Sequence, residues 1–187
     1  REFAFDSANV LARNGIRVYV FESLRPTPEL SFLTRFKGCF GGIMITASHN
    51  PGEYNGYKLY DEKGCQLVPH LADAVTAKVN AVEDELSVLA DVPEENKALI
   101  SVVGEEIDKE YFKAVESIQL NKDVNRDLIK IVFSPEHGTS NIPVRTILTE
   151  CGYHVTPVLE QCEPDPDFSN TPTPNPEQPG AYELAVE

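Results

Sequence analysis

Residues 42–51 read GIMITASHNP, in which a short apolar run passes directly into a polar loop. The run GIMIT combines apolar and β-branched side chains, which favours a buried strand. The loop that follows, residues 47–56, concentrates a hydroxyl, an imidazole and a carboxamide at Ser48, His49 and Asn50. In a parallel α/β sheet, ligands bind beyond the carboxyl ends of the strands, so this position favours a functional loop.

Helices and strands alternate on both sides of this stretch, which is typical of an α/β layer fold. The Asn14-Gly15 pair is a helix stop, and Thr27-Pro28-Glu29 resembles a helix start with Thr27 as N-cap and Pro28 as first helical residue. The predicted elements around the loop are a helix ending at Asn14, a strand over 16–21, a helix from Pro28, a hairpin over 57–68 and a helix over 69–82.

Residues 83–110 differ from the rest of the chain in charge. They hold ten acidic residues against Lys97 and Lys109, which gives a local net charge of −8. This composition predicts a solvated surface segment with short helices. Helical spacing of apolar side chains then predicts an amphipathic helix that carries Ile107, Tyr111, Val115 and Ile118 on one face.

The last part of the chain predicts a second, incomplete unit that follows a polar link. Its pattern is strand, loop, helix and strand, a βαβ unit whose two strands should be parallel. The predicted elements are a strand over 129–134, a helix over 142–151, a strand over 154–159 and a helix start at Asn175-Pro176-Glu177-Gln178. We therefore expect two domains, over residues 1–120 and 121–187.

Composition limits the classes of function. The 187 residues are 41% apolar and 25% charged, which fits a folded globular protein and excludes a disordered chain. Thirty acidic against 16 basic residues give a net charge of −14, so nucleic acid and anionic membranes are not expected partners. No apolar run reaches the roughly 18 residues of a membrane span. The four cysteines form no CxxC pair, which favours reduced thiols and a cytoplasmic protein.

The loop residues carry a resemblance to a known family. Thr46 to Pro51, followed by Glu53 to Lys58, resemble the phosphoserine loop of the α-D-phosphohexomutases, the phosphoglucomutase and phosphomannomutase superfamily. The chain looks most like phosphoglucomutases of the branch that includes phosphopentomutase-type enzymes. Further stretches that resemble the family follow in the same order along the chain, at Arg25 to Pro28, Pro135 to Thr139, Gln161 to Phe168 and Pro174 to Glu177.

The resemblance implies an enzyme that interconverts hexose 1-phosphate and hexose 6-phosphate. Ser48 would give its phosphoryl group to a sugar phosphate and recover it from a hexose 1,6-bisphosphate, which also serves as activator. Such a covalent relay divides one difficult migration into two in-line transfers. Mg²⁺ is the implied cofactor, bound in part through the phosphate of Ser48. The implied roles are catalysis for Ser48, His49 and Lys58, and orientation of the loop or substrate for Asn50, Arg25 and His137.

The family has four domains, and the resemblance implies that this chain holds the first domain without its first strand, and the start of the second. The acidic loop that supplies the aspartate ligands of Mg²⁺ has no counterpart in the sequence. We therefore expect the chain alone to be inactive without domains II–IV of its parent protein. An exposed sheet edge is also expected to let the fragment self-associate.

Simpler interpretations of the same residues remain. The hydroxyl of Ser48 could satisfy loop backbone, Lys58 could be a solvated lysine at a strand edge, and His137 could order its own loop through a hydrogen bond. Two other classes of function also remain. A serine hydrolase would use Ser48, but the sequence lacks the G-x-S-x-G elbow. A non-catalytic phosphosugar-binding module would use the loop only to hold an anion.

Overall fold

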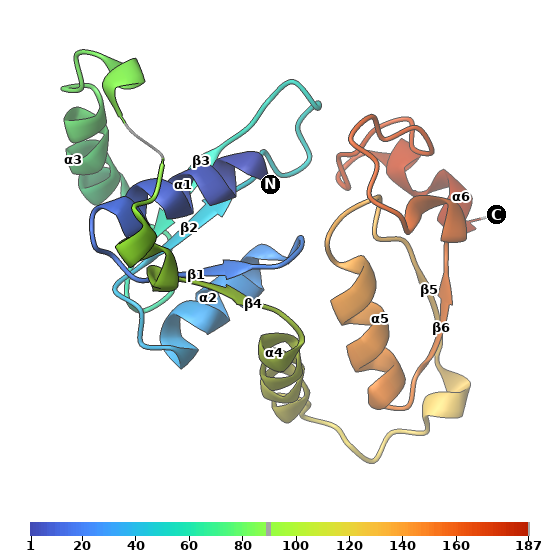
Figure 1. Cartoon of the computed structure of the whole chain (residues 1–187). Helices are drawn as coiled ribbons and strands as arrows, with labels where there is room; N and C mark the ends of the chain where they lie inside the picture. Colours follow the sequence, from blue (N-terminus) through green and yellow to red (C-terminus); the bar gives the residue numbers. More distant parts are fainter. Residues whose placement is uncertain (89–90, 187) are drawn as a thin grey trace. The chain divides into compact units, whose positions relative to one another are not determined.

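The computed structural model describes residues 1–88 and 91–186, and the chain divides into two compact units. The first unit comprises Arg1–Thr46 and Gly56–Ile107, and the second comprises Ala47–Asn55 and Asp108–Glu187 (Figure 1). By its contacts, the loop that follows the GIMIT strand therefore belongs to the second unit. None of the helices in the described part of the chain has the length and apolar character needed to cross a bilayer.

The first unit is a mixed α/β structure, as the sequence predicts. Its strands form two small sheets. In one, β1 and β4 pair in parallel, and in the other, β2 and β3 pair antiparallel. The helix α4 (Glu105–Ser117) begins in this unit and continues into the second. The other elements are α1 (Glu2–Arg13), β1 (Val18–Phe21), α2 (Thr27–Phe36), β2 (Gly42–Ile45), β3 (Tyr57–Tyr60), α3 (Pro69–Val79), the 3₁₀ helices η1 (Glu85–Ser87) and η2 (Glu94–Leu99), and β4 (Ile100–Val103).

A small apolar core joins the parallel sheet to the helices of this unit. Leu33 of α2, Val103 of β4 and Ile107 of α4 are buried together, with Ile107 only 1% exposed. Tyr19, Phe21 and Phe32 pack around them. Burying a side chain of this size stabilises a fold by about 1.5–3 kcal/mol. The core thus fixes the end of β1, from which the segment that carries Arg25 departs.

The strand β4 corrects the interpretation of residues 83–110. The acidic composition predicted a solvated segment with short helices, and residues 100–103 instead form a strand parallel to β1. Four residues are too few to show a period, and the flanking acids dominate the local composition. The buried side chain of Val103 and the pairing of Phe21 with Val103 are tertiary features that a local reading of charge cannot show.

Other boundaries differ from the sequence prediction by a few residues. Thr27 is the first residue of α2 and Pro26 is its N-cap, so Thr27 is not the cap. The second arm of the expected hairpin reduces to a single bridge between Tyr60 and Gln66. The helix α3 ends at Val79 instead of residue 82. The loop connects β2 to β3 as the residue order predicts, but these two strands pair antiparallel, so the loop does not follow a strand of a parallel sheet.

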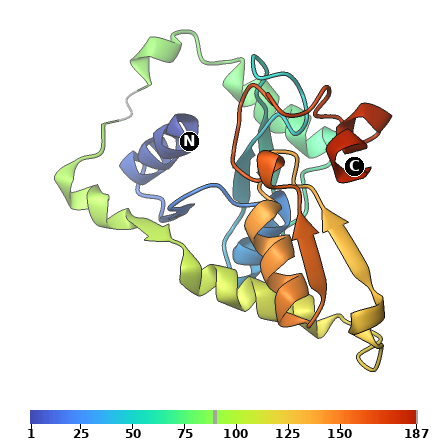
Figure 2. The same cartoon turned by 90° about the vertical axis from the view of Figure 1, so that its right-hand side faces the viewer.

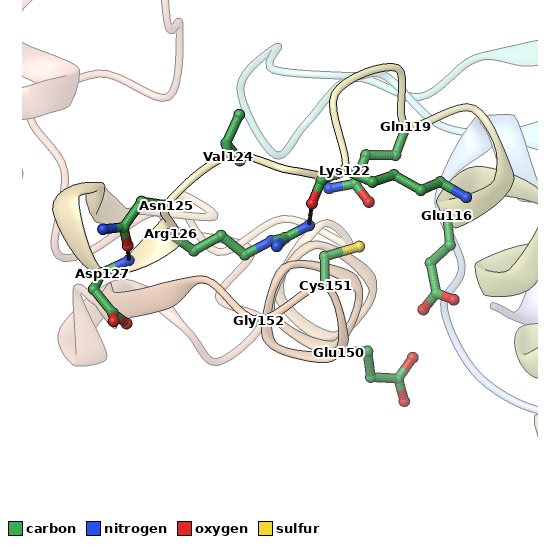
Figure 3. A pocket seen from close by; sticks show the side chains of 10 residues that line it. All are labelled: Glu116, Gln119, Lys122, Val124, Asn125, Arg126, Asp127, Glu150, Cys151 and Gly152. Atoms are coloured by element: carbon green, nitrogen blue, oxygen red, sulfur yellow. Dashed lines mark hydrogen bonds between the residues drawn. The ribbon is translucent and has the colours of Figure 1, made fainter.

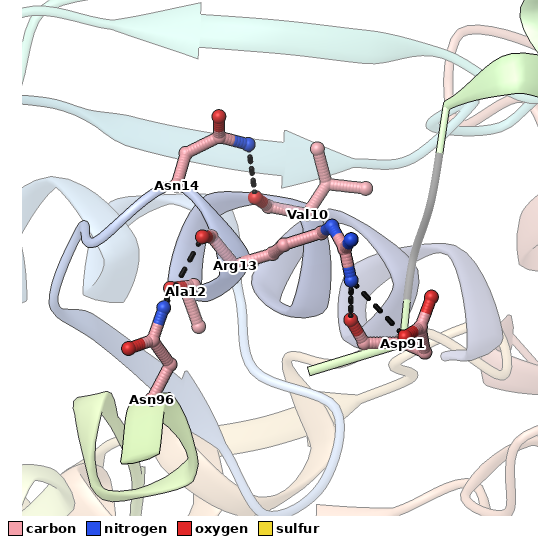
Figure 4. A network of polar contacts seen from close by, with 6 residues as sticks. All are labelled: Val10, Ala12, Arg13, Asn14, Asp91 and Asn96. Atoms are coloured by element: carbon pink, nitrogen blue, oxygen red, sulfur yellow. Dashed lines mark hydrogen bonds and ion pairs between the residues drawn. The ribbon is translucent and has the colours of Figure 1, made fainter. Parts of the chain in front are cut away.

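Side chains from the acidic region hold the end of α1 (Figure 4). Arg13 donates to the backbone oxygen of Asp91 at 2.7 Å and to its carboxylate at 3.0 Å. The amide of Asn96 donates to the carbonyl oxygens of Ala12 and Arg13 at 3.0 and 3.1 Å. The last carbonyls of a helix have no partner within it, so these contacts satisfy the C-terminus of α1. Part of the acidic segment is therefore an anchor for the first helix.

The second unit contains the expected βαβ arrangement. Strands β5 (Lys130–Phe133) and β6 (His154–Pro157) pair in parallel with Lys130 opposite His154, and α5 (Asn141–Glu150) lies along them (Figure 2). Gly152, at φ +85°, ends the helix as predicted. The expected helix start at residues 175–178 is wrong. There the Asn175 side chain accepts a hydrogen bond from the Glu177 amide in a turn. The remaining elements are η3 (Arg126–Leu128), η4 (Leu159–Gln161), η5 (Pro179–Tyr182) and α6 (Glu183–Val186).

Candidate active-site loop

The base of the loop is closed by backbone contact between its two ends. The Thr46 amide donates to the Gly56 carbonyl oxygen at 3.0 Å, next to the pairing of β2 with β3. A Cβ atom at Gly56 would lie 2.5 Å from the Thr46 oxygen, a distance that no side chain tolerates. Gly56 therefore lets the two strands meet and leaves the residues between them as a separate loop.

Ser48 has an unusual backbone conformation within this loop. Its φ is +58°, in the left-handed region that residues other than glycine seldom occupy. Such a conformation costs on the order of 1–3 kcal/mol and is concentrated at functional sites. Ser48 and His49 are exposed, and the Ser48 Oγ lies 3.4 Å from the His49 Nδ1. The turn is closed by the Asn50 amide, which donates to the Ala47 oxygen at 3.2 Å. The loop thus brings together Ser48, His49 and Asn50.

Arg25 belongs to the first unit, in the segment between β1 and α2. Its guanidinium donates to the Ser23 hydroxyl and to the Leu24 carbonyl oxygen, and it pairs with Glu22 at 3.4 Å. Its Nε also lies 3.9 Å from the carboxylate of the buried Glu29. The Arg25 side chain is only 12% exposed. These contacts fix the position of the guanidinium after the carboxyl end of a parallel strand.

Lys58, the other predicted site residue of the first unit, lies on β3 opposite Met44. It is partly buried, and it follows Gly56 by two residues. The sheet therefore holds the backbone of Lys58 at the exit of the loop, as the residue order predicts.

His137 lies in the second unit, in the loop between β5 and α5, and is 7% exposed. Its Nδ1 is 2.7 Å from the Glu163 carbonyl oxygen, which can only accept, so Nδ1 carries the proton. Its amide donates to the Gln161 oxygen at 2.8 Å. Both Glu136 and His137 have positive φ, at +49° and +61°. The loop-ordering hydrogen bond that the sequence left open is therefore present.

Gln161 lies at the centre of the same region. From the sequence, it is named only as part of the stretch Gln161 to Phe168, without an assigned role. It is 1% exposed, accepts from the Ser134 hydroxyl at 2.5 Å and donates to the Asn170 oxygen at 2.8 Å. Gln161 thereby ties residue 170 to the end of β5. One pattern could have indicated it, since Val158, Gln161 and Cys162 share one face of a helical turn and all three are buried.

Glu136 carries a buried carboxylate next to His137. Both of its side-chain oxygens are shielded from solvent and accept no hydrogen bond in the structure. This burial raises the pKa of Glu136 above its usual value of 4.5, and the neighbouring His137 opposes the shift in part. A raised pKa means that the charged form is less favourable in the folded than in the unfolded chain, so the carboxylate destabilises the fold at neutral pH.

We expect Glu136→Gln to stabilise the chain at pH 7, because it removes this buried charge and keeps the shape of the side chain. The gain in the urea midpoint should be present above the folded pKa and should disappear as the pH falls below 4.5. Urea titrations of the parent chain and the variant at pH 7 and pH 4 measure it. Glu160→Gln, at an exposed position of the same unit, is the matched control. A variant that is less stable than the parent at pH 7 would show that the Glu136 carboxylate has a favourable partner.

A hollow of the second unit is lined mainly by polar side chains and includes none of the loop residues (Figure 3). Its volume is about 610 Å³. The neighbouring Glu150 side chain raises the pKa of Glu116 there. Arg126 donates to the Lys122 oxygen at 2.9 Å and stacks over the Tyr153 ring. The hollow contains none of the predicted site residues.

The described residues do not form a Mg²⁺ site by themselves. Within residues 1–88 and 91–186, no group of three or more His, Cys, Asp or Glu side chains could hold a metal ion. Hard divalent cations take six or more oxygen ligands. Ser48 and water alone would not supply enough anionic oxygen to bind such a cation.

Comparisons with known proteins agree with the fold. Two family models match the chain: phosphoglucomutase/phosphomannomutase alpha/beta/alpha domain I over residues 1–86, and domain II of the same family over residues 109–187. Phosphoglucomutases of Staphylococcus epidermidis RP62A and Staphylococcus aureus MRSA252 are 37% and 36% identical to this chain over its full length. The chain spans 34% of the length of each of these relatives.

Solved structures give the same result. A structure from Thermus thermophilus, assigned as a phosphomannomutase, is 25% identical and superposes with a TM-score of 0.75, over 99% of this chain and 39% of its own. A phosphoglucomutase/phosphomannomutase family protein of Burkholderia thailandensis shares the fold at 18% identity, with a TM-score of 0.68 over 96% of this chain and 36% of its own. Fold and sequence together place the chain among the α/β proteins of the phosphohexomutase superfamily. The chain belongs to the phosphoglucomutase/phosphomannomutase family.

Proposed function

We propose that the protein containing this chain is a phosphohexomutase that interconverts hexose 1-phosphate and hexose 6-phosphate through a phosphoserine at Ser48. The observation that carries the proposal is the exposed loop in which Ser48 has a left-handed backbone and lies beside His49. Relatives named phosphoglucomutase over the whole chain support it. Residues 1–120 and 121–187 are proposed as its first domain and part of its second.

In the first transfer, the bond between phosphorus and the Ser48 oxygen breaks while a bond forms between phosphorus and a sugar hydroxyl oxygen, and the Ser48 oxygen takes up a proton. The proton of that hydroxyl passes to a base, a role we propose for His49. The reverse transfer, from the other phosphate of the hexose 1,6-bisphosphate, restores the phosphoserine. Lys58 stabilises the charge that spreads over the transferring oxygens, and Asn50 and Arg25 orient the loop or the substrate.

The proposed function also needs parts of the parent protein that lie outside these 187 residues. Mg²⁺, when bound, would neutralise phosphoryl charge, with the Ser48 phosphate as one ligand and its other ligands from outside the described residues. The chain spans 34% of its relatives' length, so we expect the 187 residues alone to show no turnover. We also expect the fragment to self-associate, and the parent protein to act on sugar phosphates in the cytoplasm.

Label transfer tests the proposal. The longer protein, which carries this chain with the remaining domains of its relatives, is incubated with glucose 1,6-bisphosphate labelled with ³²P in its phosphates. Tryptic cleavage after Lys37 and Lys58 then yields a peptide of residues 38–58 whose only serine is Ser48. We expect the label on that serine. Saturable binding of the bisphosphate without label would favour a phosphosugar-binding module, and turnover of an activated ester would favour a hydrolase.

A further inference from the structure

A rigid turn lies at residues 163–168, between η4 and the C-terminal segment. The Asp165 carboxylate accepts from the Asp167 amide at 3.0 Å and from the Ser169 amide at 2.8 Å. These bonds lower the pKa of Asp165 and favour its charged form. Phe168 has a positive φ of +51°, which completes the change of direction. The Asp165 side chain thus stabilises the conformation of the turn.

The loop that carries Ser48 lies directly against this turn. Both belong to the second unit, and a Cβ atom at Gly52 would lie 3.0 Å from the Pro166 carbonyl oxygen. That distance is shorter than about nine in ten Cβ contacts in proteins, so a side chain at position 52 would require one of the two backbones to shift by a few tenths of an ångström. Gly52 lies four residues after Ser48 in the same loop. The Pro166 carbonyl therefore limits where the loop can lie.

His137 holds the turn from the other side. Its Nδ1–H donates to the carbonyl of Glu163, the first residue of the turn, at 2.7 Å. Its ring lies edge-on to the Phe168 ring, with centroids 6.3 Å apart, at the last residue of the turn. A ring that is 7% exposed and contacts both ends of the turn is fixed in place.

We propose that His137 is a positioning residue for the phosphoserine loop. It fixes the turn 163–168, and the turn supports the loop at Gly52 and sets the position of Ser48. The inference rests on the proposed role of Ser48, but its structural part concerns only the loop and the turn. Neither catalytic contact with the substrate nor proton transfer is assigned to His137.

Amide hydrogen exchange of the 187-residue chain tests the structural part without any activity. His137→Leu removes the donor to Glu163 and should raise exchange in residues 47–55 and 163–168, while the urea midpoint reports on global stability. His137→Asn retains an N–H donor near the position of Nδ1 and should restore slow exchange. His154→Leu is the matched control, because His154 is an exposed histidine of the same unit. Unchanged exchange in 47–55 in His137→Leu, or equal loss in Asn and Leu variants, would overturn the proposal.

A second variant keeps the inference testable if His137→Leu does not fold. Gly52→Ala places a methyl group 3.0 Å from the Pro166 oxygen and should raise exchange in residues 47–55 only. Gly180→Ala is its control, since a Cβ there meets nothing closer than 3.6 Å. No change in exchange in Gly52→Ala would mean that the loop is not supported by the turn.

The functional part is read in the longer protein. His137→Leu should slow label transfer to Ser48 by about 10-fold or more, because a loop displaced by an ångström loses much of its alignment. The dissociation constant for glucose 1,6-bisphosphate should change less, and His137→Asn should recover most of the rate. If the parent protein itself takes no label, the proposed function fails and the exchange result still decides the positioning. Normal label transfer in His137→Leu would overturn the positioning role.

Discussion

Ser48→Ala should abolish both the phosphoserine and mutase turnover in the longer protein that contains this chain. Alanine removes the oxygen that carries the phosphoryl group, so the covalent route is lost as a whole and not merely slowed. The loop Ala47–Asn55 should keep its conformation, because alanine also reaches the left-handed region at a cost similar to that of serine. Intact mass, the labelled peptide of residues 38–58 and a coupled assay for glucose 6-phosphate measure the three parts of the prediction.

Ser87→Ala is the matched control for this experiment. Ser87 is an exposed serine at the end of η1, outside the loop, and its hydroxyl donates to the Asp84 carbonyl oxygen. We expect normal phosphorylation and normal turnover in this variant. Near-normal turnover in Ser48→Ala would show that the phosphoserine is at another residue, and that the loop serves only to bind an anion.

The elements that the sequence predicts correctly are those with local causes. Asn14 and Gly15 end α1 because glycine reaches the left-handed conformation without strain, here at φ +77°. The parallel pair β5 and β6 follows from a strand, helix and strand joined by short loops. Such features need only residues near one another in the chain.

The elements that the sequence does not predict depend on distant partners. β4 is a strand because Val103 pairs with Phe21 and is buried with Leu33, which lies 70 positions earlier. The local acidic charge favours a solvated segment, and burial of one strand overrides it. The second arm of the hairpin has strand-like residues but forms only one bridge, since nothing further pairs with it in the described chain.

The features of the candidate site also separate into those that the sequence predicts and those that it does not. The identity of Ser48, His49 and Asn50 as loop residues follows from their position after a strand. The left-handed backbone of Ser48 and the approach of Gly52 to Pro166 do not follow from that position, and the approach involves a residue more than 100 positions later in the chain. Gly52 allows the loop to lie close to the Pro166 carbonyl oxygen, which a side chain at this position would disturb.

The second large effect is expected from Lys58→Met in the longer protein. β3 holds Lys58 at the exit of the loop, two residues after the Gly56 contact that closes its base. In the proposed function, this cation stabilises charge on the transferring phosphoryl oxygens more strongly than charge on the bound sugar phosphate. Loss of one such positioned group lowers kcat by about 10²-fold or more.

The effects of Lys58→Met on kcat and on KM together distinguish a catalytic lysine from a solvated one. Methionine keeps the length and the apolar part of the side chain, so packing on β3 should be conserved. Lys63→Met, in the exposed turn after β3, is the matched control and should leave kcat unchanged. If Lys58 contributed only to attraction of a dianion, Lys58→Met would raise KM and leave kcat as it is, with an effect that salt screens. A fall in kcat that persists at about 0.5 M salt, with a small change in KM, is the expected result, because a positioned charge acts at short range in the transition state.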